Sequence, residues 1–225
     1  MTTSVKVFGS PASTEVQRVL ACLFEKNVKF QLVKMDNFKG STRRPEYLKM
    51  QPGGEALAYQ DEKGSLVESR AICRHVVNSF PNQGTMDLLG EGAMEKALIE
   101  QWLETEMHKF DPPSSELVFY LSIAPTLPEQ DPKDDSSLVA ASKKKLEKVL
   151  KLYNQRLADS PYLTGDKFTL ADLSHLPNTE KLMSIKELQE MFGKYDHVRR
   201  WWVDISERGP WQKVLEVAKQ APPLA

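Results

Sequence analysis

The part of the chain up to residue 80 alternates strand-type and helix-type patterns, and this alternation is the feature that most limits its fold. Short apolar runs and stretches with helix periodicity follow one another, beginning in turn at Val5, Thr14, Phe30, Glu46, Ala56, Ser65 and Ser69. The resulting order is β-α-β-α-β-β-α, and its last two strands are joined by a short turn. This order predicts a small α/β domain with a mixed sheet.

The remainder of the chain changes character, because helix periodicity replaces the alternation. Turn residues at 81–84 mark the change, and helical stretches then cover residues 93–110, 138–157 and 197–206. We therefore predict an α/β domain over residues 1–81, a linker over 82–91 and an all-helical domain over 92–225.

Local signals predict several helix boundaries in this second part. The Pro-Pro pair at 112–113 is expected to interrupt the first helix. The Thr-Leu-Ala-Asp segment at 169–172 has the spacing of a capping box, with Asp in place of Glu, and is expected to open a buried helix. The Gly-Pro pair at 209–210 is expected to stop the last clear helix.

Composition and charge exclude some classes of partner. Hydrophobic residues make up 40% of the chain and charged residues 27%, as in ordinary globular proteins. Lys and Arg number 30 against 31 Asp and Glu, so no basic field favours nucleic acid or an anionic membrane. Neither a membrane-spanning stretch nor a signal-peptide pattern is found, which favours a cytoplasmic protein.

The residues most often used in metal and redox sites are scattered. Cys22 and Cys73 lie among apolar residues at helical spacing, so we expect buried, reduced thiols. The histidines lack metal-ligand spacing, so no metal site is expected, and His175 is interpreted as a core residue.

Several motifs, taken together and in order, resemble those of the plant phi-class glutathione transferases over nearly the whole chain. They cover residues 6–13, 17–20, 68–72, 82–85, 168–178, 199–202 and 205–208. The resemblance implies a thioredoxin-like N-terminal domain that binds glutathione and a helical C-terminal domain that supplies the pocket for an electrophile. It also implies homodimers, and glutathione as a co-substrate with no permanently bound cofactor.

Ser13 is the candidate catalytic residue. It lies where the first strand meets the first helix, so its hydroxyl can sit beside the positive partial charge of a helix N-terminus. A hydroxyl there can donate a hydrogen bond to the glutathione thiolate and lower the thiol pKa. The alternative is a plain N-cap, which Ser13 or Thr14 supplies equally well.

Further glutathione-site candidates follow from the resemblance. The Ser69 hydroxyl and nearby backbone amides suit the γ-glutamyl carboxylate, and Glu68 suits the α-ammonium group; a helix cap is again the alternative. Thr42 and Arg43 replace a His-Lys pair of the family, and Arg43 can still serve the glycyl carboxylate. Arg18 and Arg70 are interpreted as structural residues first.

The match breaks at residues 51–57. Where the family has Asn-Pro-Phe-Gly-(Gln/Lys)-Val-Pro, this chain reads Gln-Pro-Gly-Gly-Glu-Ala-Leu, and Leu57 takes the place of the cis-proline. A cis bond before a non-proline residue costs about 2.5–4 kcal/mol, so we expect Ala56–Leu57 to be trans and the backbone clamp on glutathione to be displaced. Glu55 adds negative charge near an anionic ligand. The alternative is that a loop rearrangement restores the contacts.

The second-substrate pocket is assigned by position to Ala12, Phe38, Phe119 and Tyr120, with Met107, His108 and Phe110 as additional wall residues. The two aromatic residues at 119 and 120 can equally be core residues. The leading functional interpretation is a transferase acting on small hydrophobic electrophiles. The alternatives are a non-catalytic carrier of flavonoid-like or other hydrophobic metabolites and a specialised enzyme of secondary metabolism.

Overall fold

The computed structural model describes residues 5–35, 41–55, 57–126 and 136–220, and the chain divides into two compact units. The first unit runs up to Leu88 and resumes at Gly209; the second covers Leu89–Arg208. The predicted linker over 82–91 and helical domain over 92–225 stay predictions. The last helix, α11 (Gly209–Lys219), packs against α1 of the first unit.

The first unit is built on a four-stranded mixed sheet with the order β2-β1-β3-β4. The strands are β1 (Val5–Gly9), β2 (Phe30–Lys34), β3 (Leu57–Asp61) and β4 (Gly64–Leu66). β1 pairs with β2 in parallel and with β3 antiparallel, and β3 and β4 form the expected hairpin. The predicted thioredoxin-like order of strands and helices is confirmed.

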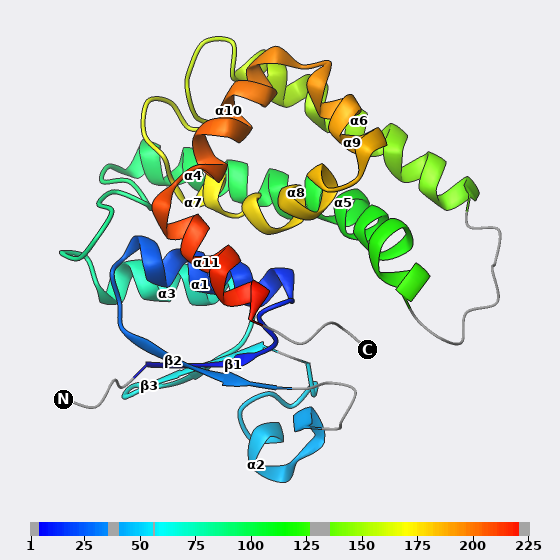
Figure 1. The fold of residues 1–225 in the computed structure, drawn as a ribbon. Helices are drawn as coiled ribbons and strands as arrows, with labels where there is room; N and C mark the ends of the chain where they lie inside the picture. Colours follow the sequence, from blue (N-terminus) through cyan, green and yellow to red (C-terminus); the bar gives the residue numbers. More distant parts are fainter. Residues whose placement is uncertain (1–4, 36–40, 56, 127–135, 221–225) are drawn as a thin grey trace. The chain divides into compact units, whose positions relative to one another are not determined.

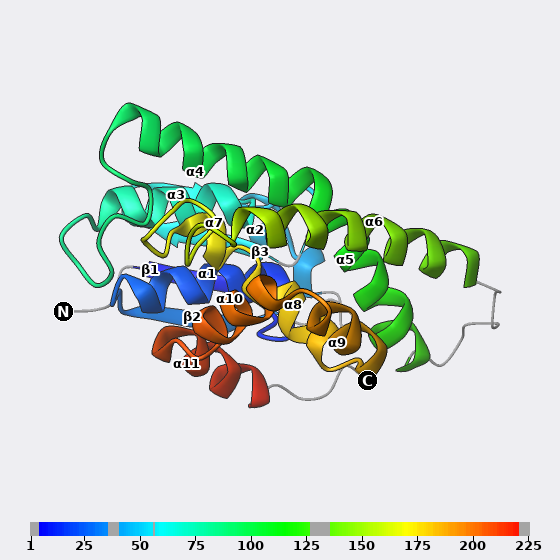
Figure 2. The same ribbon diagram turned by 90° about the horizontal axis from the view of Figure 1, so that it is seen from above.

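Helices α1 (Thr14–Glu25) and α3 (Ser69–Ser79) cover one face of this sheet, whereas the short α2 (Pro45–Leu48) lies on the opposite side (Figures 1 and 2). A 3₁₀ turn at Ser41–Arg43 precedes α2. Most residues of α1 are buried, because α1 packs against α3 and α11. The predicted burial of Cys22 on α1 and Cys73 on α3 as free thiols is confirmed.

The register of the sheet decides where its connecting segments meet. Gly9, the last residue of β1, pairs with Lys34 at the end of β2 and with Leu57 at the start of β3. Leu66, the last residue of β4, pairs with Tyr59 near the start of β3, so β4 also ends at this edge of the sheet. The segments that follow β1, β2 and β4, and the one that precedes β3, therefore all lie at one edge of the sheet.

The end of α1 holds the segment that follows α3. Lys26 is buried, and its ammonium group donates to the carbonyl of Thr85 at 2.9 Å. Gly84 has φ of 59°, and a Cβ added there would lie 2.0 Å from the Glu25 carbonyl oxygen. Because no side chain fits this approach, glycine is required where the chain leaves α3.

The second unit is helical. Its elements are α4 (Ala93–Thr105), a π-helical turn (Glu106–Phe110), α5 (Asp111–Val118), a second π-helical turn (Phe119–Ile123), a 3₁₀ turn (Ala124–Thr126), α6 (Ser136–Arg156), α7 (Leu170–Leu173), α8 (Leu176–Met183), α9 (Lys186–Gly193) and α10 (Asp196–Ser206).

The expected interruption at Pro112 and Pro113 is wrong. The helical path continues through the π turn into α5, whose first turn contains the prolines. Proline is tolerated there because its fixed φ suits the first turn of a helix, and the widened π turn accommodates the missing donors. The Gly-Pro pair at 209–210 likewise begins a helix, α11, after ending the previous one.

The predicted capping box is confirmed. The Thr169 side chain accepts from the Ala171 amide, and the Asp172 carboxylate accepts from the Thr169 amide at 3.0 Å. The Trp201 indole also donates to Asp172, at 2.9 Å. His175 is fully buried, with Tyr153 Oη 2.8 Å from its Nε2, which confirms it as a core residue.

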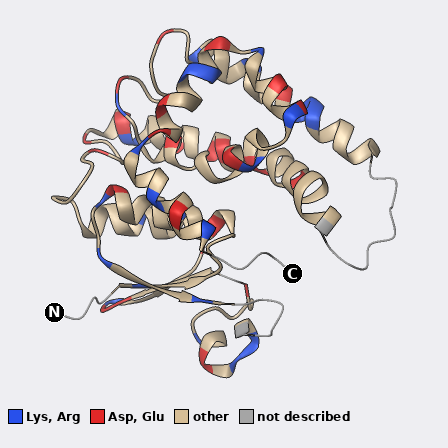
Figure 3. Cartoon of the chain, in the orientation of Figure 1, with Lys and Arg blue, Asp and Glu red and all other residues tan. Residues whose placement is uncertain are grey.

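The surface carries charges of both signs. Lys and Arg are interspersed with Asp and Glu over the helices of each unit, in keeping with a formal net charge of −1 (Figure 3). Among the residues that the structure describes, no helix is both long enough and apolar enough to cross a membrane.

Candidate functional site

The residues predicted to bind glutathione come from segments that meet at one edge of the sheet. Ser13 follows β1, Arg43 follows β2, Glu55 precedes β3, and Ser69 follows β4. Their neighbours Thr42 and Glu68 lie in the same segments. The topology therefore gathers, from distant parts of the sequence, the segments that the resemblance assigned to one ligand.

Ser13 stands immediately before α1 with extended backbone angles, φ −73° and ψ 132°. Its carbonyl accepts the first helical hydrogen bond from the Gln17 amide at 2.9 Å, whereas its hydroxyl makes no capping hydrogen bond. The side chain is half-buried, as is the neighbouring Ala12. Ser13 is thus the N-cap by position, but its hydroxyl does not perform the capping.

Glu68 and Ser69 form the start of α3. Glu68 is the exposed N-cap residue and has φ of 68°, a strained value for a residue other than glycine. Ser69 is the first helical residue, so the alternative in which Ser69 caps α3 is wrong. Its hydroxyl is buried and accepts a 2.8 Å hydrogen bond from Nη1 of Arg18 on α1. Sequence reasoning treated Arg18 as structural and missed this contact.

Thr42 and Arg43 differ in exposure. Thr42 is buried within the 3₁₀ turn, whereas the Arg43 side chain is exposed. The guanidinium group of Arg43 is therefore open to an anion from solvent, while the Thr42 side chain faces protein.

The turn that follows Gln51, where the sequence departs from the family pattern, is held by hydrogen bonds from Tyr47 on α2 and from the Gln51 side chain. The Tyr47 hydroxyl on α2 donates to the Glu55 carbonyl at 2.6 Å. The Gln51 side-chain amide donates to the Leu57 carbonyl at 3.3 Å and to the Glu55 carboxylate at 3.4 Å, and its oxygen accepts from the Gly53 amide at 3.1 Å. Sequence reasoning did not single out Tyr47 or Gln51. The only sequence feature that could have pointed to these two residues is the run of turn-forming residues beside them.

Two predicted site residues, Phe38 and Ala56, lie outside the described residues. The prediction of a trans Ala56–Leu57 bond lies outside them as well. Leu57 itself is buried and begins β3.

The predicted second-substrate residues of the second unit lie on its two π-helical turns, whereas Ala12 precedes α1 in the first unit. Phe119 is 37% exposed and Tyr120 half-buried, with ring centroids 5.2 Å apart in an edge-to-face arrangement. Within this unit they are therefore not ordinary core aromatics. Met107 is half-buried and His108 exposed, but Phe110 is buried and stacks on Tyr153, so it belongs to the core.

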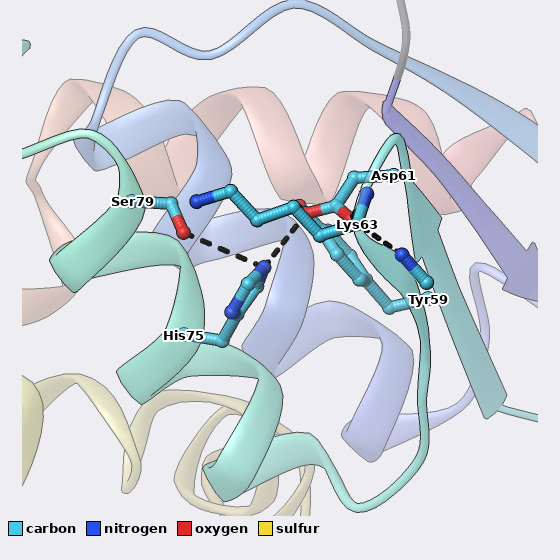
Figure 4. Close-up of polar contacts among 6 residues, drawn as sticks. Tyr59, Asp61, Lys63, His75 and Ser79 are labelled. Atoms are coloured by element: carbon cyan, nitrogen blue, oxygen red, sulfur yellow. Dashed lines mark hydrogen bonds and ion pairs between the residues drawn. The ribbon is translucent and has the colours of Figure 1, made fainter.

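A separate polar cluster joins the β3–β4 hairpin to α3. His75 Nε2 lies 2.7 Å from an Asp61 oxygen, which also accepts from the Tyr59 hydroxyl at 3.2 Å (Figure 4). The Ser79 hydroxyl approaches the same Nε2, at 3.5 Å. A Ser-His-Asp triad needs serine and aspartate on opposite ring nitrogens, so this cluster is not one.

Metal chemistry has no site among the parts of the chain that the structure describes. No three His, Cys, Asp or Glu side chains gather there in a way that could hold a metal ion.

Comparison with known proteins assigns the family. Residues 3–78 match the glutathione S-transferase N-terminal domain, and residues 111–209 match the C-terminal domain. Glutathione S-transferase F12 of Arabidopsis thaliana is 38% identical over 95% of this chain and 98% of its own.

Solved structures agree in fold. Glutathione transferase F2 of Populus trichocarpa superposes with a TM-score of 0.92 and 45% identity, over 96% of this chain and all of its own. Maize glutathione S-transferase I in complex with an atrazine–glutathione conjugate has a TM-score of 0.88 and 30% identity, over 99% of this chain and all of its own. The chain therefore belongs to the glutathione S-transferase family, in its plant phi class, and its identification as a glutathione transferase is confirmed at the level of the family.

Proposed function

We propose that this protein conjugates the thiolate of glutathione to small hydrophobic electrophiles and that the Ser13 hydroxyl stabilises the thiolate. The proposal rests on one observation. Ser13 lies at the N-terminus of α1, and its hydroxyl makes no capping hydrogen bond. The maize relative with the same fold, solved with a glutathione conjugate of atrazine, supports this choice of substrate class.

The proposed chemistry needs no permanently bound cofactor. The glutathione thiol loses its proton to solvent, and the thiolate accepts a hydrogen bond from Ser13 while the N-terminus of α1 contributes positive partial charge. The sulfur lone pair then forms the C–S bond, and the leaving group departs with the electron pair of the bond that breaks. Ser13 donates throughout and is not the nucleophile.

The groups at the sheet edge would hold the rest of glutathione. Ser69 and the first amides of α3 suit the γ-glutamyl carboxylate, and the exposed Glu68 carboxylate suits the α-ammonium group. The exposed guanidinium of Arg43 suits the glycyl carboxylate. The backbone between Glu55 and Leu57 is the candidate for pairing with the cysteinyl residue.

Phe119 and Tyr120 are our candidates for contact with the hydrophobic electrophile. Their rings form a partly exposed edge-to-face pair on a π-helical turn, and such turns are frequent at functional sites. A flat aromatic or chlorinated substrate would bury apolar area against them.

A carrier of hydrophobic metabolites with a weakened glutathione site is the second candidate. The observation that favours it is the segment with Glu55 and Leu57, where a carboxylate and a non-proline residue replace the family pattern. The family fold and the apolar contacts would then serve binding without conjugation.

We also propose that the protein is a homodimer and that it acts in the cytoplasm. The dimer follows from the resemblance, in which each subunit associates through both of its domains. The cytoplasmic location is suggested by free, buried cysteines and by the absence of a spanning helix among the described residues.

Calorimetric titration with glutathione, followed by a conjugation assay with 1-chloro-2,4-dinitrobenzene, tests the proposal. Binding together with formation of the thioether is the expected result. A protein that binds a planar hydrophobic dye but neither binds nor consumes glutathione would be a carrier, and the transferase proposal would fail.

A further inference from the structure

We propose that Cys22 and Cys73 are a redox pair, which hydrogen peroxide closes to a disulfide between α1 and α3, and that this disulfide weakens the hold on glutathione. The effect on glutathione rests on the proposed function, whereas formation of the disulfide does not. These two residues are the only cysteines of the chain. Both are free thiols, 0% and 2% exposed.

Each thiol reaches across to the opposite helix. The Cys22 thiol on α1 donates to the carbonyl of Cys73 at 3.6 Å. The Cys73 thiol on α3 donates to the carbonyl of Arg18, one turn before Cys22, also at 3.6 Å. A disulfide joins residues that are direct neighbours in space, with Cα atoms about 4.4–6.8 Å apart. A sulfur that contacts the carbonyl of its partner residue is a direct neighbour of that residue, so the pair meets the first condition for a bond.

The two thiols also act on each other. Burial raises the pKa of Cys22 well above its ordinary value, and a hydrogen bond and a charge interaction with the Cys73 side chain raise it further. Two thiolates in contact would repel each other, whereas a disulfide carries no charge. Because little thiolate forms, oxidation is slow, and the pair responds to sustained exposure and not to a brief one.

The reaction with peroxide is balanced within the pair. One sulfur attacks a peroxide oxygen, the O–O bond breaks, and a sulfenic acid and one water form. The second sulfur attacks the sulfenic sulfur, the S–O bond breaks, and a second water leaves as the S–S bond forms. The two sulfurs lose two electrons, and their protons end in the waters. Peroxide is small enough to enter a buried site that a tripeptide disulfide cannot reach.

The pair lies one helical turn beyond the start of the candidate glutathione site. The contact from Arg18 to Ser69 and the contact from Cys22 to Cys73 both join positions 51 apart in the sequence. α1 and α3 therefore run in the same direction and advance together from one contact to the next. Ser13 and Ser69 lie at the N-terminal ends of these two helices, so the disulfide would join the elements that carry both serines.

Closing the bond changes the separation of the two helices. An S–S bond is about 2.05 Å long, shorter than any contact between unbonded sulfurs. Because protein interiors are close-packed, the helices must shift to allow it. Ser13 and Ser69 move with their helices, and binding groups lose affinity when they are displaced from their working geometry. We expect the oxidised protein to bind glutathione about 3-fold to 10-fold more weakly than the reduced protein.

The test treats the protein with hydrogen peroxide for several hours, removes the peroxide with catalase, and measures intact mass, free thiols and peptide linkage. We expect the single chain to lose about 2 Da, both thiols to disappear together, and the peptides with Cys22 and Cys73 to be joined. Calorimetric titration with glutathione follows before oxidation, after it, and after dithiothreitol. Dithiothreitol should restore the affinity, which separates the disulfide from oxidation of methionines such as the exposed Met94.

Cys22→Ala and Cys73→Ala are the matched controls. Each should show no loss of glutathione affinity that dithiothreitol reverses. Either variant suffices if the other does not fold, and the dithiothreitol arm in wild type needs neither. Thiols that survive the treatment, sulfinic acids without a linkage, a bond between two chains, or a disulfide with unchanged glutathione affinity would each overturn the inference.

The proposed function can fail separately. A reduced wild type that binds no glutathione would refute the proposed function and, with it, the effect of the disulfide on glutathione. The mass and the peptide linkage would still decide whether the disulfide forms.

Discussion

The Tyr47 hydroxyl donates a 2.6 Å hydrogen bond to the backbone carbonyl of Glu55 and so ties α2 to the turn before β3. Burial, and secondarily the Glu55 charge, raises the pKa of Tyr47 to about 12, so the phenol stays a donor at any physiological pH. Because Tyr47 itself is buried, water does not readily replace it. The described part of the turn that departs most from the family pattern is therefore anchored to α2 by a buried donor.

Replacing Tyr47 with Phe should lower the free energy of unfolding by about 1 kcal/mol, the usual net value of one hydrogen bond. It should also weaken glutathione binding, because the freed turn must be ordered by the ligand. Urea unfolding and calorimetry measure the two effects. Tyr195→Phe is the matched control, since that hydroxyl reaches Glu147 at 3.3 Å in the second unit. Equal glutathione affinity in the two variants would argue against a role for the Tyr47–Glu55 hydrogen bond in glutathione binding.

Ser13→Ala should reduce the conjugation rate on the order of 100-fold and raise the apparent pKa of bound glutathione. Stability should change little, because the Ser13 hydroxyl makes no capping hydrogen bond. The pH–rate profile and urea unfolding provide the measurements, with Ser79→Ala as a serine control on α3. An unchanged pH–rate profile would mean that another group stabilises the thiolate.

Leu57→Pro, alone or with Glu55→Gln, should tighten glutathione binding about 10-fold. Proline lowers the cost of a cis bond by a few kcal/mol, and the first position of a strand such as β3 tolerates it. Glu55→Gln alone separates the charge effect from the backbone effect. The gain should appear in glutathione affinity before any change in second-substrate preference. A Leu57→Pro variant with wild-type affinity would show that this site tolerates the departure.

Acid should weaken the contact between Asp61 and His75. Burial alone would raise the pKa of Asp61, but hydrogen bonds from His75, the Lys63 amide and Tyr59 bring it below its ordinary value. A carboxyl group with a lowered pKa in the folded state adds stability above its unfolded pKa of about 3.9 and loses it as pH falls through the folded value. The difference in unfolding free energy between wild type and Asp61→Asn should therefore shrink below about pH 4. Asp159→Asn, an exposed substitution in the second unit, is the control, and a difference that is constant with pH would contradict the assignment.

Sedimentation equilibrium should give a mass of about 51 kDa, twice the 25.5 kDa of one chain. The expectation rests on the resemblance to homodimeric transferases. A species of 25.5 kDa that does not change with protein concentration would refute it.

The order of elements in the first unit could be predicted because each strand and helix has a clear period and a turn between neighbours. Ser69 at the start of α3 and Thr14 at the start of α1 were placed correctly from these patterns. The thioredoxin-like order also places the candidate site segments at one edge, since register follows from which strands pair.

The structural features that the sequence did not predict depend mainly on contacts between residues that are far apart in the chain. The bond from Arg18 to Ser69 spans 51 positions, and no local pattern distinguishes a buried arginine from one on a helix surface. Helix α11 was missed because a Gly-Pro pair usually follows a helix end, whereas Gly209 and Pro210 here also form the first turn of another helix. The π turns were missed because their hydrogen bonds follow from packing and leave the helix period almost unchanged.

The two halves of the candidate site have separate supports. Ser69 is held from α1 through Arg18, whereas the turn at 51–57 is held from α2 through Tyr47 and from within through Gln51. Mutations in the turn therefore leave the α1–α3 pair, which also carries Ser13, in place. Under the proposed function, variation in this one short segment would change how the middle of glutathione is held while the fold and Ser13 are kept, so a lineage could pass between conjugation and ligand carriage.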